Sequence, residues 1–531
     1  MSHGPRHPRL RAGTGAVLAI VALLLVLAVA RVQASSSRPG RPAEVAVQRI
    51  TGGRAPAIVA VGSGPPQAVV TLAGRSAPLG VPRSFLGLST EYWTVPIWAR
   101  HLSLLGHVLA SITPHGPMVL RIGGSSADQT FFASPKEPPE WVFETSPAWL
   151  AQVRRIVTTF GVRVILDLNM VTATPQIAVR WARAARAALP AGSVIGFEIG
   201  NEADIYSHTA WQELTGGAIA ARVLPQTMTA PSYADSYRVY AAALARVARG
   251  VPLLGPALSD PAAHLSWISR LLAGPHPGLG AITVHRYPLS ACAPPGWRMF
   301  PTIARVLSNR ATTGMAASIR SSVRAARGAG LPLRLTEINS VTCGGRRGVS
   351  NTFATALWAP DALFELLHAG AASAAVHVRA NAINMAFSLT RHGLVAHPLL
   401  YGMAMFARTI GPGAHLVALH LSVHRGLRLK AWGVRLPGNR LHVLLINKGA
   451  VGVRVSLRIP AQGRTTAQAL LAPSVRATAG VTLGGQHLSR HGLWTGAPAT
   501  TALSLGRGGG YRVAVRGYSA TLVTARLGPM R

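Results

Sequence analysis

The sequence predicts an α/β fold: a (β/α)8 TIM barrel at about residues 80–395, followed by a C-terminal all-β sandwich domain at residues 396–531. Three observations support this prediction. Short apolar runs alternate with amphipathic stretches between residues 85 and 380, eight of these runs have strand character, and the pattern becomes all-β after about residue 395. Strands that alternate with helices favour parallel pairing, and eight such units over roughly 300 residues fit a closed barrel.

The barrel elements follow from the apolar runs and from the helical spacing between them. The expected strands are Phe85–Ser89, Met118–Ile122, Val162–Leu168, Val194–Ile199, Val251–Pro256, Ala281–His285, Leu331–Glu337 and Ala374–Val378. Helices are expected at about 147–160, 175–189, 232–249, 263–273, 302–327 and 351–369.

The C-terminal region shows strand-like runs separated by Gly, Pro and Asn turns, a pattern typical of a sandwich. The expected strands are His415–Ser422, Gly426–Val434, His442–Asn447, Gly452–Ile459, Ala467–Ala472 and Tyr511–Ala525. Two further β-like runs, Ala57–Ala60 and Ala68–Leu72, precede the barrel. Residues 57–79 have no place in the barrel, so we expect them to join the β domain.

The first 34 residues have the features of an export signal. Basic residues are followed by an apolar stretch from Ala12 to Ala30 and by the small-residue motif Val32-Gln33-Ala34. Because the apolar stretch is close to the length that spans a bilayer, residues 1–34 could be a cleaved signal peptide or a membrane anchor. Residues 35–56 are polar and rich in Pro, Gly and Arg, which indicates a linker. Either reading predicts an extracellular or cell-surface protein.

The chain is strongly basic. Its 531 residues include 53 Lys and Arg but only 16 Asp and Glu, a formal net charge of +37, and no acidic residue follows Glu365. This imbalance predicts that the basic β domain attracts an anionic polysaccharide or a membrane surface, although adaptation to an acidic exterior explains it equally well. Because the basic residues are scattered, we expect no specific nucleic-acid partner. The histidines lack metal-ligand spacing, so we expect neither a metal nor a cofactor.

Two glutamates lie where a barrel places its reacting groups, at the C-terminal ends of strands. Glu202 follows the fourth expected strand and Glu337 ends the seventh. A retaining glycosidase needs two carboxyl groups about 5–5.5 Å apart, one as acid/base and one as nucleophile. Asn201 could donate to the sugar hydroxyl beside the anomeric carbon, and Tyr287 could hydrogen-bond Glu337 and hold it ionised. We therefore expect a carbohydrate substrate.

Several motifs occur together and in order along the barrel. They are residues 85–92 (FLGLSTEY), 120–128 (LRIGGSSAD), 198–204 (EIGNEAD), 285–292 (HRYPLSAC), 336–340 (TEINS), 343–345 (CGG), 348–353 (GVSNTF), 357–358 (LW) and 397–402 (HPLLYG). In these motifs the chain resembles glycoside hydrolase family 79, the β-glucuronidase and heparanase-like group of clan A retaining enzymes. The resemblance covers about residues 80–410 and, more loosely, the β domain.

The resemblance implies a role for the main site residues. Glu202 would be the acid/base, Glu337 the nucleophile and Tyr287 the residue that orients it. Glu91 and Asp128 would bind hydroxyls of the sugar in the −1 subsite, although they could instead be polar groups that close the barrel mouth.

Other residues complete the expected site. His285, at the end of the sixth strand, is expected to bind substrate. Because the loops after strands six and seven are neighbours in this fold, the resemblance implies a Cys292–Cys343 disulfide at the active-site rim. Glu198 lies four positions before Glu202 and is expected to be structural, paired with an arginine such as Arg121 or Arg163.

The chain departs from the family after the eighth strand. Glucuronidases of the family bind the substrate carboxylate partly with a tyrosine-bearing loop there, but this chain has no tyrosine between His377 and Tyr401. Arg379 could hold a carboxylate, whereas Asn381 or Asn384 could equally serve a neutral sugar.

The sequence thus predicts an exported retaining β-glycosidase, β-glucuronidase-like, that removes β-linked uronic acid or related sugars from glycans or glycoconjugates. One alternative is another clan A glycosidase, such as a xylosidase or arabinofuranosidase. A second is a non-catalytic glycan-binding wall protein, against which the intact glutamate pair speaks. For the enzyme we expect a raised pKa at Glu202 beside a largely ionised Glu337.

Overall fold

The computed structural model describes residues 64–73, 79–112, 116–133, 138–206, 228–506 and 508–528. The expected signal or anchor, the linker and the run Ala57–Ala60 lie outside these residues. Within them, no helix has both the length and the apolar character needed to cross a bilayer.

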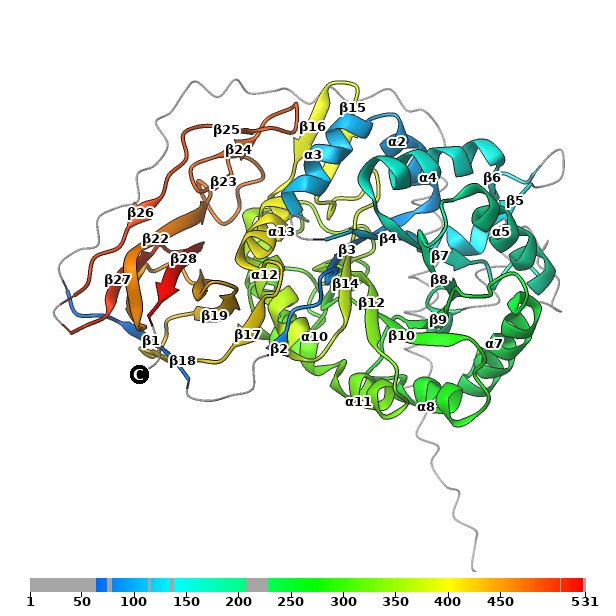
Figure 1. Cartoon of the computed structure of the whole chain (residues 1–531), viewed down its shortest axis with the longest axis horizontal. Helices are drawn as coiled ribbons and strands as arrows, with labels where there is room; N and C mark the ends of the chain where they lie inside the picture. The colour runs from blue at the N-terminus through cyan, green and yellow to red at the C-terminus, as the bar shows by residue number, and fades with distance from the viewer. Residues whose placement is uncertain are drawn as a thin grey trace, which may run out of the picture.

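Eight parallel strands close into a barrel, in the order β10-β12-β14-β3-β4-β7-β8-β9 (Figure 1). The strands are β3 (Leu86–Glu91), β4 (Val119–Gly123), β7 (Arg163–Leu168), β8 (Val194–Ile199), β9 (Leu253–Leu258), β10 (Leu279–Arg286), β12 (Leu333–Ile338) and β14 (Ser373–His377). Each overlaps one expected strand, so the predicted fold class is confirmed. Nearly all of their residues are buried, because the barrel interior lies on one side and the helices on the other.

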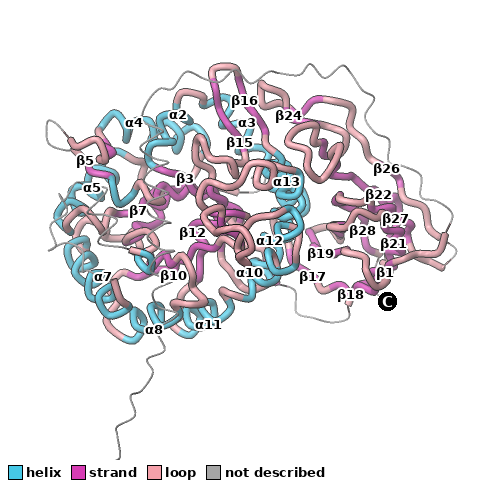
Figure 2. The backbone as a smooth tube through the Cα atoms, turned by 180° about the vertical axis from the view of Figure 1, so that it is seen from behind, coloured by secondary structure: helices cyan, strands magenta, loops and turns pink. Residues whose placement is uncertain are grey.

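Helices surround the barrel on its outside (Figure 2). They include α2 (Val95–Ala99), α3 (Leu102–Ile112), α4 (Pro147–Phe160), α5 (Pro175–Ala188), α7 (Ala230–Leu244), α8 (Leu265–Ala273) and α12 (Phe353–His368). Local signals set some of their ends: Ser146 caps α4 by accepting a hydrogen bond from the Trp149 backbone N–H, and Gly161 ends it in a left-handed conformation at φ 62°.

The single helix expected at 302–327 is wrong. The segment is divided into α9 (Ile303–Val306), the 3-10 turn η4 (Asn309–Ala311), α10 (Thr313–Ala317) and α11 (Arg320–Gly328). Ser308 has an extended backbone, and its hydroxyl accepts a hydrogen bond from the Ala311 N–H. A hydroxyl side chain that caps the next turn competes with continuation of a helix, which the apolar spacing alone did not reveal.

The β domain contains two large sheets and a short two-stranded one, in which β24 (His487–Leu488) pairs with β25 (Trp494–Thr495). One large sheet has the order β18-β1-β21-β27 and the other the order β2-β17-β19-β20-β28-β22-β23, with β26 paired to β22. The strands are β1 (Ala68–Leu72), β2 (Leu79–Gly80), β17 (His415–Val417), β18 (Leu419–Val423), β19 (Leu429–Leu436), β20 (Arg440–Asn447), β21 (Val453–Arg458), β22 (Ala461–Leu471), β23 (Thr482–Leu483), β26 (Thr501–Ala502), β27 (Tyr511–Val515) and β28 (Ser519–Leu527). Their apolar faces share one core, to which Val70, Val455, Val443 and Val523 belong.

Two details of the β domain differ from the expected strands. The run Tyr511–Ala525 forms β27 and β28, which lie in different sheets, and His415–Ser422 forms β17 and β18, which also lie in different sheets. Tyr518, at φ 46°, lies in the turn between β27 and β28. The turn contains one glycine, Gly517, and an isolated glycine within a strand-like run is equally typical of a bulge, so the pattern predicted one strand instead of two.

The contact between the barrel and the β domain contains buried charges. Lys448 pairs with Asp361 of α12, and Lys430 pairs with Glu365 one turn later on the same helix. Trp432 Nε1 also donates to Asp361, at 2.9 Å. Because the sequence has no acidic residue after Glu365, the lysines of the β domain depend on the barrel for their counter-charges. Helix α13 (Pro398–Thr409), just after the predicted domain boundary at 396, packs on α12 and on strands of the larger β sheet.

Candidate active site

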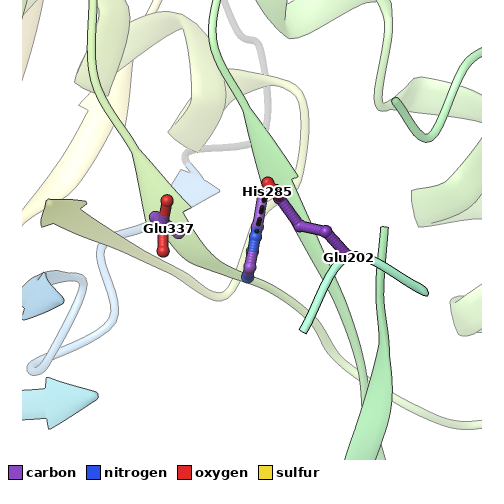
Figure 3. A group of neighbouring side chains, drawn as sticks. All are labelled: Glu202, His285 and Glu337. Carbon is purple, nitrogen blue, oxygen red and sulfur yellow. Dashed lines mark hydrogen bonds and ion pairs between the residues drawn. The ribbon is translucent and has the colours of Figure 1, made fainter. Parts of the chain in front are cut away.

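The two glutamates expected to carry the chemistry lie together at the mouth of the barrel (Figure 3). Glu337 belongs to β12, and Glu202 lies three residues after the end of β8. Parallel strands of a barrel all end on one face, so residues that follow different strands meet there. One carboxylate oxygen of each glutamate and a ring nitrogen of His285 all lie within 4.8 Å of one another.

Glu337 is held by three donors. Its Oε1 accepts from the Tyr287 hydroxyl at 2.7 Å and lies 2.9 Å from His377 Nδ1, while its Oε2 accepts from Arg121 Nη1 at 2.9 Å. Burial alone would raise the pKa of this carboxyl, but His377, His285 and Arg121 lower it well below its usual range. The predicted hydrogen bond between Tyr287 and Glu337 is present, and the lowered pKa favours the ionised form of Glu337.

Arg121 organises the layer beneath the two glutamates. It is fully buried, and besides Glu337 it bonds Glu198 through Nε at 2.8 Å and Asp167 through Nη2 at 2.7 Å. The expected pairing of Glu198 with an arginine is confirmed, and Arg121 is the partner. The same Nη2 donates to Asn201 Oδ1 at 2.9 Å. Because a guanidinium can only donate, this bond fixes the orientation of the Asn201 amide and directs its Nδ2 group away from Arg121.

Glu202 occupies an unusual backbone position. Its φ is 53°, in the left-handed region that residues other than glycine rarely adopt. Its backbone N–H donates to the Ala257 carbonyl at 3.0 Å. The carboxyl Oε1 lies 3.0 Å from His285 Nδ1, and the side chain remains 20% exposed. Burial raises the pKa of Glu202, and the nearby Glu337 adds to this rise, although His285 opposes it. The two carboxyl groups therefore have pKa values displaced in opposite directions.

The expected sugar ligands Glu91 and Asp128 are both buried and already accept hydrogen bonds from the chain. Glu91 Oε2 accepts from the Ser126 N–H at 2.9 Å. Asp128 Oδ1 accepts from the Met170 N–H at 3.0 Å, and Oδ2 accepts from the Tyr206 hydroxyl at 2.9 Å. Burial raises the pKa of Asp128 to about 7. Because both oxygens of Asp128 have protein donors, the geometry favours the alternative that it closes the barrel mouth.

The three candidates after the eighth strand differ in position. Asn384 is buried; its Nδ2 donates to the Val341 carbonyl at 2.7 Å, so this amide joins two loops of the rim. Arg379 is half-buried, with Nη2 beside Gly344. Asn381 is exposed, at φ 64°. Of the three, Arg379 is the residue with a cation to offer a substrate carboxylate.

The expected disulfide between Cys292 and Cys343 is confirmed, with a Cα–Cα distance of 5.9 Å. It joins the loops that follow two short parallel strands, β11 (Leu289–Ser290) and β13 (Val341–Thr342). These strands extend beyond β10 and β12, so the bridge lies at the rim, on the side of Tyr287 and Glu337.

His377 and Tyr206 also belong to the site, although they were not among the residues predicted from the sequence. His377 is the last residue of β14 and contacts both Glu337 and Tyr287, each at 2.9 Å from Nδ1. A polar residue at the end of an apolar strand was the signal used for Glu337, and it could have found His377 as well. Tyr206 bridges Asp128 and the Asn201 N–H, a contact that only the folded loop reveals.

Glu202, His285 and Glu337 also have the residue types of a metal site. Their surroundings do not suit a cation. Arg121 lies 2.9 Å from Glu337 Oε2, and Tyr287 donates to Oε1, so both oxygens of this carboxylate already face donors. A divalent ion would have to displace these groups and sit near a buried guanidinium, which opposes binding.

Comparison with protein-family models and with curated protein sequences found no match. Solved structures do match. The 4-O-α-L-rhamnosyl-β-D-glucuronidase from Fusarium oxysporum 12S is 17% identical, with a TM-score of 0.67 over 86% of this chain and 100% of that chain. The family GH51 arabinofuranosidase from Xanthomonas axonopodis pv. citri is 16% identical, with a TM-score of 0.62 over 87% and 100%. The α-L-arabinofuranosidase from Thermotoga maritima is 16% identical, with a TM-score of 0.61 over 87% and 100%.

The chain has the fold of these glycoside hydrolases. At such low identity the likeness extends to the barrel and its β domain and not to a particular substrate. The resemblance to family 79 rests on the sequence motifs and stays a prediction.

Proposed function

We propose that this protein is a retaining β-glycosidase. The observation that carries the proposal is the pair Glu202 and Glu337, which have carboxylate oxygens within 4.8 Å of each other. Retaining enzymes separate their carboxyl groups by about 5–5.5 Å, whereas inverting enzymes need about 6.5–9.5 Å to admit a water molecule. The opposite pKa displacements support the same assignment, because an acid must hold its proton and a nucleophile must not.

In the first step, Glu337 attacks the anomeric carbon while Glu202 gives its proton to the leaving oxygen. The bond from carbon to the aglycone oxygen breaks, and an ester bond to Glu337 forms. In the second step, Glu202 takes a proton from water, the water oxygen attacks the same carbon, and the ester bond breaks. The enzyme returns to its first state, with Glu202 protonated and Glu337 ionised.

For the substrate we propose a β-linked uronic acid or a related sugar on a glycan or glycoconjugate, as in family 79. Arg379 supports this choice because it follows β14 and can pair with a carboxylate. One structural relative is a glucuronidase, but others are arabinofuranosidases, which keeps a neutral pentose as the second candidate. We further propose that the protein acts outside the cell and that its basic β domain meets an anionic polysaccharide or membrane surface.

A panel of 4-nitrophenyl β-glycosides, extended by the α-L-arabinofuranoside, tests the proposed activity and its substrate class. We expect release of nitrophenol from the glucuronide and retention of anomeric configuration in the product, which NMR can follow. Turnover of the xyloside or of an arabinofuranoside without turnover of the glucuronide would overturn the uronic acid proposal. Absence of turnover on every sugar, combined with glycan binding, would favour the non-catalytic binding protein.

Glu202→Gln should affect substrates according to their leaving groups. With a 4-nitrophenyl or natural aglycone, we expect kcat/KM to fall about 10²–10⁴-fold, because Gln cannot donate the proton. With a 2,4-dinitrophenyl aglycone, which leaves without a proton, the first step should be nearly unaffected. The wild-type pH profile should fall on the alkaline side as Glu202 loses its proton and on the acid side as Glu337 gains one. Glu202→Gln should remove the alkaline limb alone, and an alkaline limb that persists would contradict the assignment.

A further inference from the structure

His377 stands in an unusual position between two carboxylates. Its side chain is 11% exposed. Nδ1 lies 2.9 Å from Glu337 Oε1 and 2.9 Å from the Tyr287 hydroxyl, and Nε2 lies 3.6 Å from Glu91 Oε1. The backbone is held too, because Asn339 Nδ2 donates to the His377 carbonyl at 3.0 Å.

The contact with Glu337 determines where the imidazole carries a proton. An ionised carboxylate can only accept, so a nitrogen at hydrogen-bond distance from it must donate. Nδ1 therefore bears hydrogen and shares it between Glu337 and the Tyr287 oxygen. Nε2 is buried and has no hydrogen-bond partner among the described residues. The hydrogen bond to Glu337 thus comes from one defined atom of the ring.

We propose that His377 is a positioning residue that controls how readily Glu337 leaves the sugar in the second step. The proposal rests on the retaining mechanism proposed above. In that step the bond from the anomeric carbon to Glu337 breaks, and its electron pair returns to the carboxylate. A hydrogen bond to Oε1 is stronger when Glu337 is a free carboxylate than when it is part of the glycosyl ester. It therefore stabilises the carboxylate that this step releases. In the first step the same bond stabilises the reactant, so it offers no acceleration there.

Other groups around the ring act on Glu337 at the same time. Tyr287, which follows β10, donates to Oε1, and Arg121 of β4 donates to Oε2. Glu91 of β3 lies near Nε2, and one oxygen of Glu202 and a ring nitrogen of His285 of β10 lie within 4.8 Å of an oxygen of Glu337. Removing His377 therefore removes one of several groups that stabilise the Glu337 carboxylate and leaves the others in place. We expect the second step to slow and the first step to change little.

The test uses His377→Leu, which removes the donor, and His377→Asn, whose Nδ2 lies near the position of Nδ1. With a 2,4-dinitrophenyl glycoside of a sugar that the wild type turns over, we expect His377→Leu to lower kcat about 10-fold or more. The value of kcat/KM should change much less. A pre-steady-state burst should appear, and the glycosyl-enzyme should accumulate on the peptide that contains Glu337, as measured by mass spectrometry. His377→Asn should recover most of the lost kcat.

A second measurement does not depend on turnover. The chain has only ten glutamates, so ¹³C-carboxyl NMR can follow the titration of Glu337 in the full protein. We expect His377→Leu to raise the pKa of Glu337 and His377→Asn to restore it partly. An inactive wild type would refute the proposed glycosidase but leave this titration as a test of the hydrogen bond. Equal losses in kcat and kcat/KM with an unchanged Glu337 pKa, in a variant that keeps its melting temperature, would overturn the role of His377.

Discussion

Glu337→Gln is expected to lower kcat/KM about 10⁴-fold or more on any glycoside that the wild type cleaves. Gln is close to Glu in shape but cannot attack the anomeric carbon, so no covalent intermediate forms. Arg121 keeps Glu198 and Asp167 as partners when the charge at 337 is lost, so the fold should persist. Steady-state kinetics together with a thermal melt measures both consequences.

Two controls make this result specific. Glu144→Gln changes an exposed glutamate of the short strand β6 (Phe143–Thr145) and should leave kcat/KM unchanged. A 2-fluoro glycoside with a good leaving group should label the wild type at the peptide containing Glu337 and fail to label Glu337→Gln. Labelling at another residue, or retention of more than a tenth of the wild-type activity, would show that Glu337 is not the nucleophile.

Arg121→Met is expected to cause the largest loss of stability. Arg121 is the shared partner of Asp167, Glu198 and Glu337, and the side chains of Arg121, Asp167 and Glu198 are completely buried. Removing one partner of a single buried ion pair costs about 3–5 kcal/mol of unfolding free energy, and here three carboxylates lose their counter-charge together. We therefore expect a loss at the top of this range or beyond, measured by urea unfolding near neutral pH.

The loss in Arg121→Met should depend on pH in a defined direction. Burial already raises the pKa of Asp167 in the folded state, and loss of the guanidinium, which lowers it, raises it further above its value in the unfolded chain. Groups of this kind stabilise the fold at low pH and lose that contribution as pH rises. The gap between wild type and variant should therefore widen from acidic to neutral pH, and a constant gap would contradict this explanation.

Arg163→Met and Arg121→Lys are the matched controls. Arg163 lies on the neighbouring strand β7 but is exposed, so its loss should change the unfolding free energy by less than about 0.5 kcal/mol. Arg121→Lys keeps one positive charge, but an ammonium group lacks the planar set of donors with which Arg121 bonds three carboxylates. We therefore expect an intermediate loss of unfolding free energy. If Arg163→Met were as damaging as Arg121→Met, the buried network would not be the cause.

The barrel could be predicted because burial on both faces gives each parallel strand a continuous apolar run. Phe85–Ser89 and Val162–Leu168 were recognisable on this ground, and both became barrel strands, as β3 and β7. The segment 302–327 could not be read in the same way. Its breaks depend on short hydroxyl caps such as Ser308, whose local signal was weaker than the apolar spacing around it.

The order of strands and helices, and the two strand ends at which Glu202 and Glu337 lie, could be predicted from the sequence. These features depend on periodicity and on position along the chain. Which side chains meet could not be predicted, because it depends on how the strands pair in three dimensions. Arg121 reaches Glu337 across 216 positions of sequence, and His377 meets Tyr287 across 90. Such contacts arise from the register and closure of eight strands, which bring distant residues within hydrogen-bond distance and which no local pattern records.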